Sequence, residues 1–261
     1  MLGKLFKHEF KATARLLLPL YLVLAVMTLM DRIVINLDIF TGVLSIIPGI
    51  ISFIYVISII AIIVVSFVII ILRFYKNLMT DEGYLMFTLP AKSSELINSK
   101  LFASMLWTFA SVIGVAASIF CLFITPERFV KLQEGFSLAF AELEVAFQGK
   151  VTILIIEFIL LFLIALINSI LEIYFSIAIG QLFNGHKVLG SFGAYIVIST
   201  VIQILSTLVL ALVGLSNHYR FNEFSSLPDI VMPFSILFLL VTTVIYYLGT
   251  DLIFKKKLNL E

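Results

Sequence analysis

The sequence has few charged residues and a single cysteine, and each shortage excludes a class of protein. Only 13% of the 261 residues are charged, whereas soluble globular domains carry about 25%. Cys121 alone excludes an intrachain disulfide framework and a thiolate metal cluster. A net charge of +1, with no cations clustered among aromatic residues, gives no indication of nucleic-acid binding. Hydrophobic residues make up 62% of the chain and the mean hydropathy is +1.18, which indicates a membrane protein.

Catalytic and nucleotide-binding motifs are missing as well. The sequence contains no G-x-x-x-x-G-K-[ST] phosphate-binding loop, no H-E-x-x-H zinc motif and no G-x-S-x-G nucleophile motif. His8, His186 and His218 are widely separated, so no metal site is expected. We therefore predict that the chain is not an enzyme and carries no cofactor of its own.

Six apolar runs are long enough to cross a bilayer, which takes about 20 residues in a helix. They cover residues 16–30, 50–72, 101–124, 151–179, 192–215 and 230–253. The sequence thus predicts an all-α polytopic protein, with residues 1–261 forming a single transmembrane domain. Between the third and fourth runs, residues 125–150 alternate charge with phenylalanine, and we expect short helices on the outer surface there.

The lysines and arginines predict which side of the membrane each end faces, because cations near span ends are retained in the cytosol. With the N-terminus inside, 12 of the 17 cations are cytosolic and 5 are outside. Both termini are therefore predicted to be cytosolic, as an even number of spans requires. The outer cations are Arg32, Arg128, Lys131, Lys150 and Arg220.

Residues 2–15 show the pattern of an amphipathic helix lying in the lipid headgroup layer. On a helical wheel the apolar side holds Leu2, Leu5, Phe6, Phe10 and Thr13, and the opposite side holds Lys4, Lys7, Lys11 and Arg15. Glu9 is the one residue that does not fit. A secretory signal peptide is disfavoured, because no small-residue cleavage site follows.

Polar residues inside the predicted spans must face protein or water, because lipid cannot satisfy them. In the fourth span Glu157 and Glu172 are offset by about 60° on the wheel, and Asn168 lies within about 20° of Glu157. The fifth span carries Ser199, Gln203 and Ser206, and the third carries Ser104, Thr108, Ser111 and Ser118. Two interpretations stay open. Interhelical hydrogen bonding is favoured for the hydroxyls, whereas Glu157, Asn168, Glu172 and Gln203 could line a translocation path or a proton site.

The longest polar interruption on the predicted cytosolic side runs from Arg73 to Lys100. Thr80 can cap a helical turn that has Asp81 and Glu82 in its first positions, where acids suit the helix dipole. Before Pro90 the turn exposes large apolar groups that need cover from lipid or protein, namely Tyr84, Leu85, Phe87 and Leu89. Ser93 or Ser94 can then cap the helix that becomes the third span.

Within this segment, DEGYLMFTLPAKSSELINSK resembles the pattern G-Y-L-x-x-T-L-P-x-x … L-x-x-S-K of type 2 ATP-binding-cassette (ABC) exporter permeases. The likeness is to the small permease subunits of Gram-positive bacteria, and it implies a bacterial cell-membrane location. In that family the loop between the second and third spans forms a coupling helix that docks on a separate ATPase subunit. The resemblance places these residues at that contact: Asp81, Glu82, Gly83, Tyr84, Leu85, Phe87, Leu89 and Pro90.

The resemblance further implies a complex with ATPase subunits, which would hold ATP and Mg, and with a second permease subunit, identical or related. Residues 2–15 would brace the same ATPase. The outer loops have no room for the large extracellular domain of some members. The implied substrate is hydrophobic or amphipathic, such as a peptide or drug.

A protein without a motor is the competing interpretation. It would be a proton-coupled secondary transporter using Glu157 and Glu172, or a binding or immunity protein. The sequence shows no clear internal repeat and no Gly/Pro-broken spans, which argues against a secondary transporter.

Overall fold

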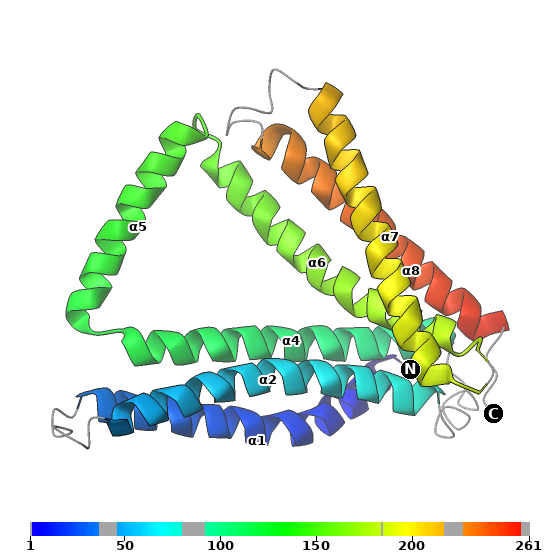
Figure 1. The fold of residues 1–261 in the computed structure, drawn as a ribbon, viewed down its shortest axis with the longest axis horizontal. Helices are drawn as coiled ribbons and strands as arrows, with labels where there is room; N and C mark the ends of the chain where they lie inside the picture. The colour runs from blue at the N-terminus through cyan, green and yellow to red at the C-terminus, as the bar shows by residue number, and fades with distance from the viewer. Residues whose placement is uncertain (1, 37–45, 80–91, 184, 217–226, 257–261) are drawn as a thin grey trace. The chain divides into compact units, whose positions relative to one another are not determined.

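The computed structural model describes residues 2–36, 46–79, 92–183, 185–216 and 227–256. Within these ranges the chain is helical and contains no strand (Figure 1). The helices are α1 (Leu2–Asn36), α2 (Ile46–Met79), α4 (Ser93–Phe123), α5 (Pro126–Ala146), α6 (Val151–Gly180), α7 (Lys187–Ser216) and α8 (Met232–Lys256). A single π-helical turn, η2 (Leu227–Val231), leads into α8. Residues 81–90, which include the predicted ATPase contact, lie outside the described ranges.

Six of these helices are long and apolar enough to cross a membrane: α1, α2, α4, α6, α7 and α8. The expected all-α architecture with six spans is therefore confirmed, and the chain is a multi-pass membrane protein. An α-helix suits this environment because it satisfies its own backbone hydrogen bonds. Their apolar residues stay exposed on the outside of the helices, for example Leu22 at 66% and Phe53 at 65%. Such surface matches a lipid solvent.

Two segments differ in detail from the expectation. Residues 2–15 are not a separate element but the first part of α1, which continues without a break through Pro19 to Asn36. At 35 residues α1 is about 52 Å long, well beyond the roughly 30 Å hydrocarbon core, so part of it must extend into the headgroup region or beyond. Residues 126–146 form one helix, α5, in place of the several short helices expected.

The chain divides into two compact units. Unit 1 consists of residues 1–74 and 98–132, and unit 2 consists of residues 75–97 and 133–261. Each is described by itself below. That the two units act as one transmembrane domain stays a prediction.

In unit 1, α1, α2 and α4 lie side by side along their lengths (Figure 1). Leu24, Tyr55 and Ile62 form a buried cluster, which side chains of α4 such as Val115 cover. Hydroxyl groups join the same helices. The Ser118 hydroxyl lies 2.8 Å from that of Thr28 and 2.7 Å from that of Tyr55.

The Ser111 hydroxyl lies 2.7 Å from that of Tyr21 and donates to Ser66 at 3.0 Å. Ser111 and Ser118 therefore make the interhelical hydrogen bonds expected of the third span. Each such bond contributes about 0.6 kcal/mol in membrane proteins.

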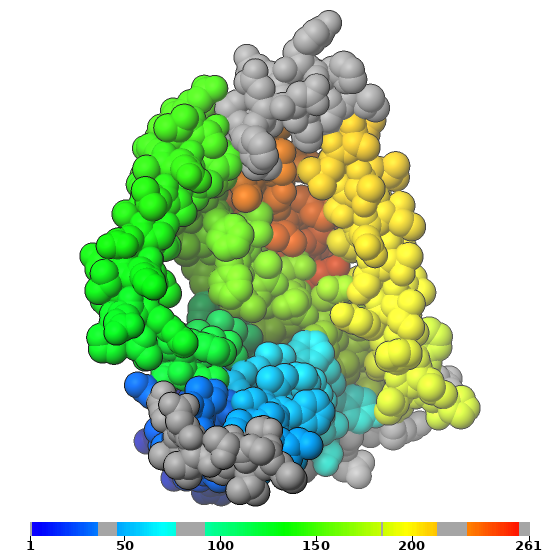
Figure 2. Space-filling view, turned by 60° about the vertical axis from the view of Figure 1, so that its left-hand side comes forward, coloured from blue at the N-terminus to red at the C-terminus, as the bar shows by residue number. Residues whose placement is uncertain are grey.

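In unit 2, α6 packs against both α7 and α8, and Figure 2 shows α7 with the parts of α6 and α8 that it leaves uncovered. Helices α6 and α8 run in the same direction, because Asn168 contacts Thr242 and Phe175 contacts Gly249 further along both helices. Both pairs are 74 positions apart, so residue n of α6 faces residue n + 74 of α8. This register places Glu172 opposite Tyr246.

Candidate functional site

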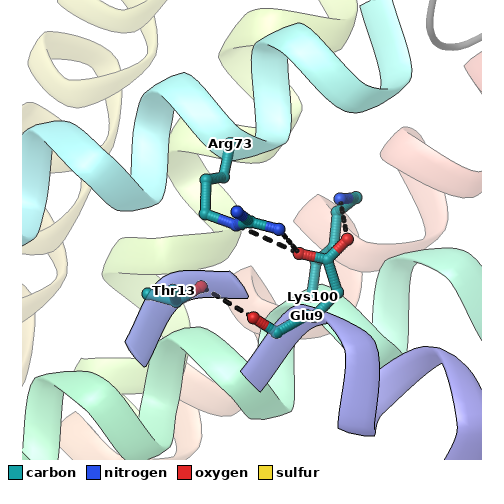
Figure 3. A network of polar contacts seen from close by, with 4 residues as sticks. All are labelled: Glu9, Thr13, Arg73 and Lys100. Carbon is teal, nitrogen blue, oxygen red and sulfur yellow. Dashed lines mark hydrogen bonds and ion pairs between the residues drawn. The ribbon is translucent and has the colours of Figure 1, made fainter. Parts of the chain in front are cut away.

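The structure shows polar clusters in two places: at the base of the predicted coupling segment in unit 1, and between the helices of unit 2. At the first, Glu9 of α1 binds one residue of α2 and one of α4 (Figure 3). Its Oε2 accepts hydrogen bonds from Nη2 of Arg73 at 2.6 Å and from Nε at 3.2 Å. Its Oε1 accepts one from Nζ of Lys100 at 2.6 Å. Arg73 and Lys100 are the two residues that bound the predicted cytosolic segment.

The position of Glu9 on α1 explains why it did not fit the wheel. It lies one turn from Thr13 on the side opposite the cations, and the Thr13 hydroxyl donates to the Glu9 carbonyl at 2.9 Å. This side of α1 faces α2 and α4, so the Glu9 carboxylate is directed at its two partners rather than at solvent (Figure 3). The misfit in the sequence was thus the signal of a buried ion pair, although the sequence did not indicate its partners.

The side chains of this cluster are largely buried, so their charges must be paired. The side chain of Glu9 is 8% exposed and that of Lys100 is 3% exposed, while Arg73 retains 21%. Charges taken out of water must be paired, and hydrogen bonds between ionised groups are about twice as strong as neutral ones. The Glu9 carboxylate ties the first helix to the two helices that flank the predicted cytosolic segment.

A second polar contact lies in unit 2, where the predicted cytosolic segment joins α4. The Ser93 hydroxyl donates to Oδ1 of Asp251 in α8 at 2.6 Å, and Asp251 also binds Lys255. Ser93 is the first residue of α4 and does not cap the helix as expected, because its hydroxyl donates to Asp251. The cap is supplied by Glu95, whose carboxylate accepts from the backbone N–H of Lys92 at 3.2 Å.

The exposed side of α1 carries the predicted membrane-surface cations. Leu5 and Phe6 are half-buried, whereas the four cations are exposed: Lys4, Lys7, Lys11 and Arg15. Phe10 stacks on Trp107 of α4, with ring centroids 4.9 Å apart. The amphipathic pattern therefore serves packing on one side of α1 and leaves the cations available to anionic groups on the other.

The residues predicted to line a translocation path are spread along α6 and α7. Glu157 and Glu172 are 15 positions apart on α6, which is about 22 Å along the helix. Glu157 lies near the start of α6, in the part of unit 2 that holds the ion pair between Lys150 and Asp229 at 2.6 Å. Glu172 instead accepts a hydrogen bond from the Ser199 hydroxyl of α7 at 2.5 Å. The two glutamates therefore have different surroundings, and that they line one path stays a prediction.

Asn168 and Gln203 have different surroundings. The Asn168 amide donates to the hydroxyls of Thr242 at 2.7 Å and Thr243 at 3.0 Å, which joins α6 to α8. Gln203 is exposed, one turn beyond Ser199 on α7. Sequence reasoning missed Tyr246, whose hydroxyl is buried beside this face and has no hydrogen-bond partner within the described ranges. The sequence signal that could have found Tyr246 is its position four residues after Thr242, which places both polar side chains on one face of α8.

Comparison with protein-family models, with curated proteins and with solved structures found no match to this chain.

Proposed function

We propose that the chain is the permease subunit of an ABC exporter, driven by a separate ATPase subunit that docks on the cytosolic segment between Arg73 and Lys100. The resemblance of residues 81–100 to the coupling segment of type 2 ABC permeases suggests the class. The observation that carries the proposal is the ion-pair cluster of Glu9, Arg73 and Lys100.

The cluster gives the segment a mechanical connection to the membrane helices. A coupling helix transmits a push only if its flanks are held in a fixed relation to the helices that must move. Glu9 binds both flanks at 2.6 Å and belongs to α1, so a displacement of the segment acts on α1, α2 and α4 together. The hydrogen bond from Ser93 to Asp251 connects the end of the segment to α8 in the same way.

The energetics of such a motor are those of differential binding. The ATP-bound partner shifts the permease between orientations only as far as it binds one of them more tightly. A complex would contain ATPase subunits, which hold ATP and Mg, and a second permease subunit, identical or related. The cargo is a hydrophobic or amphipathic molecule.

The test is purification of the tagged chain from membranes of its own source, followed by identification of the proteins that accompany it. We expect a chain with a Walker phosphate-binding loop to co-purify. Tyr84→Asp and Phe87→Asp place a charge in the proposed contact and should each reduce the recovered ATPase at least about tenfold, the effect of roughly 1.4 kcal/mol.

Phe136→Asp is the matched control, because Phe136 is 71% exposed on α5, on the predicted outer side. It should leave ATPase recovery unchanged. If no ATPase accompanies the chain, or if all three variants recover it equally, the proposal fails. Transport that persists without any ATPase would identify a carrier without a motor.

A further inference from the structure

The carboxylate of Glu172 lies where three helices of unit 2 meet. It projects from α6, accepts a hydrogen bond from Ser199 of α7, and faces Tyr246 of α8 through the register of α6 and α8. Tyr195 lies one turn before Ser199 on α7, and both Glu172 and Tyr195 are within electrostatic range of the Tyr246 phenol. Glu172 is half-buried, so a ligand can reach it.

Most acids of the described chain that make strong contacts pair with a cation, and Glu172 does not. Glu9, Asp229 and Asp251 each bind a lysine or arginine, whereas Glu172 and Asp31 each accept a hydrogen bond from a neutral serine hydroxyl. Asp31 is 1% exposed, whereas Glu172 is half-buried and accessible. Within the described ranges no cation forms an ion pair with Glu172. A carboxylate within a membrane span is costly, by up to about 2.5 to 3.5 kcal/mol at the bilayer centre on the lenient insertion scale, and such residues commonly mark ligand pathways.

Tyr246 gives a second, independent indication of a ligand. The residue is 2% exposed, and its hydroxyl has no hydrogen-bond partner in the described part of the chain. A buried hydroxyl without a partner is destabilising by about 1 to 3 kcal/mol, so such a group in a native protein requires an explanation. A ligand that donates a hydrogen bond to the phenol oxygen would supply the missing partner.

Aromatic residues of all three helices lie near the same position. Tyr246 stacks on Phe175, with ring centroids 5.7 Å apart, and Tyr195 is 38% exposed on the adjoining face of α7. A cation over an aromatic face gains about 0.5 to 2 kcal/mol, and the gain is larger when the site is desolvated. A carboxylate, a hydroxyl in need of a donor and aromatic rings form the set of groups that recognises an organic ammonium ion.

We propose that Glu172, Tyr246 and Ser199 bind the ammonium group of an amphipathic amine, whose apolar part lies against the lipid-facing surface of α7. The carboxylate pairs with the ammonium charge, and the ammonium N–H donates to the Tyr246 oxygen. As an assignment of substrate class this rests on the proposed exporter function, but the binding itself does not require the ATPase.

The depth of the site fits this ligand. Glu172 lies eight residues before the end of α6, which is about 12 Å along the helix from the predicted cytosolic end. An amphipathic amine in the inner leaflet holds its ammonium group near that level and its chain in the hydrocarbon. The site is therefore accessible from the leaflet in which an exporter collects its cargo.

Binding of tritiated dodecylammonium to the purified full-length chain, measured by scintillation proximity, tests the inference. Dodecanol is the neutral competitor of the same chain length. We expect saturable binding that unlabelled dodecylammonium displaces and dodecanol does not. Loss of the charge in Glu172→Gln should weaken binding about 30-fold or more, as expected when one partner of a desolvated charge pair is removed.

Further variants separate the site from the fold. Glu172→Asp keeps the charge and should bind with intermediate affinity, and Tyr246→Phe keeps the ring and should weaken binding about tenfold. Glu142→Gln removes an exposed carboxylate of α5 and should bind like the wild type. Equal binding by wild type and Glu172→Gln, or equal competition by dodecanol, would overturn the site. Failure of the ATPase to co-purify would leave this result intact, so the two proposals fail separately.

Discussion

At the scale of single residues, the carboxylate of Glu9 links the three helices of unit 1. Glu9 accepts hydrogen bonds from both Arg73 and Lys100, and the side chain of Lys100 is only 3% exposed. Replacing a buried ion pair by apolar groups can be harmless, whereas removing one partner is strongly destabilising because it leaves a buried charge unpaired. The cluster is therefore most sensitive to loss of its single acid.

We expect Glu9→Gln to lower the free energy of unfolding by about 3 kcal/mol, the lower end of the range for breaking a buried pair. The measurement is reversible unfolding in mixed detergent micelles, followed by circular dichroism. Arg73→Gln and the double variant complete a mutant cycle, which should show a coupling of about 1 kcal/mol or more. Glu127→Gln, which removes an exposed acid of α5, should change stability by less than about 0.5 kcal/mol. A coupling energy of zero between Glu9 and Arg73 would contradict a stabilising ion pair.

At the scale of helices, unit 2 is assembled through close approaches at small residues. A Cβ on Gly180 of α6 would lie within 2.5 Å of the backbone nitrogen and 2.6 Å of the Cα of Ser191 in α7. Backbone atoms cannot rotate away as a side-chain tip can, so the two helices depend on glycine at this point. Small residues at helix contacts are the usual means by which membrane helices approach each other.

Gly180→Ala should therefore destabilise unit 2 by about 2 kcal/mol, within the range for overpacking a tight contact. Gly193→Ala is the matched control, since Gly193 lies inside α7 and a Cβ there would meet nothing within 4 Å. That variant should be neutral or more stable by up to about 1 kcal/mol, because alanine favours a helix. The measurement is the midpoint of thermal unfolding of the two variants, compared under the same conditions. Equal midpoints would show that α6 and α7 do not pack this closely.

The apolar runs predicted the spanning helices well, because hydropathy over about 20 residues depends only on composition. The continuity of α1 through Pro19 and the single helix α5 were not predicted, because hydropathy reports where lipid begins and not where backbone hydrogen bonding ends. At the sites, Glu9 and Glu172 stood out as charges in apolar surroundings. Their partners could not be foreseen, because Arg73, Lys100 and Ser199 reach them only through the packing of separate helices.

At the scale of the whole molecule, the alternation of six spans predicts that the start of α1, the segment between α2 and α4, and the end of α8 face the same side of the membrane. The excess of lysine and arginine predicts that this side is the cytosol. The same topology predicts that the Glu9 cluster of unit 1 and the contact between Ser93 and Asp251 of unit 2 face the side where ATP is available. The central claim is that an ATPase subunit docks on that segment.

Cysteine-directed crosslinking in native membranes measures this most directly. Cys121 is the only cysteine, so a Cys121→Ala background accepts single probes at Tyr84→Cys, in the segment, and Leu138→Cys, exposed on the predicted outer side. We predict that the probe at position 84 forms an adduct with a chain carrying a Walker phosphate-binding loop, and that the probe at position 138 does not. No such adduct at position 84, or equal adducts at both positions, would contradict the account.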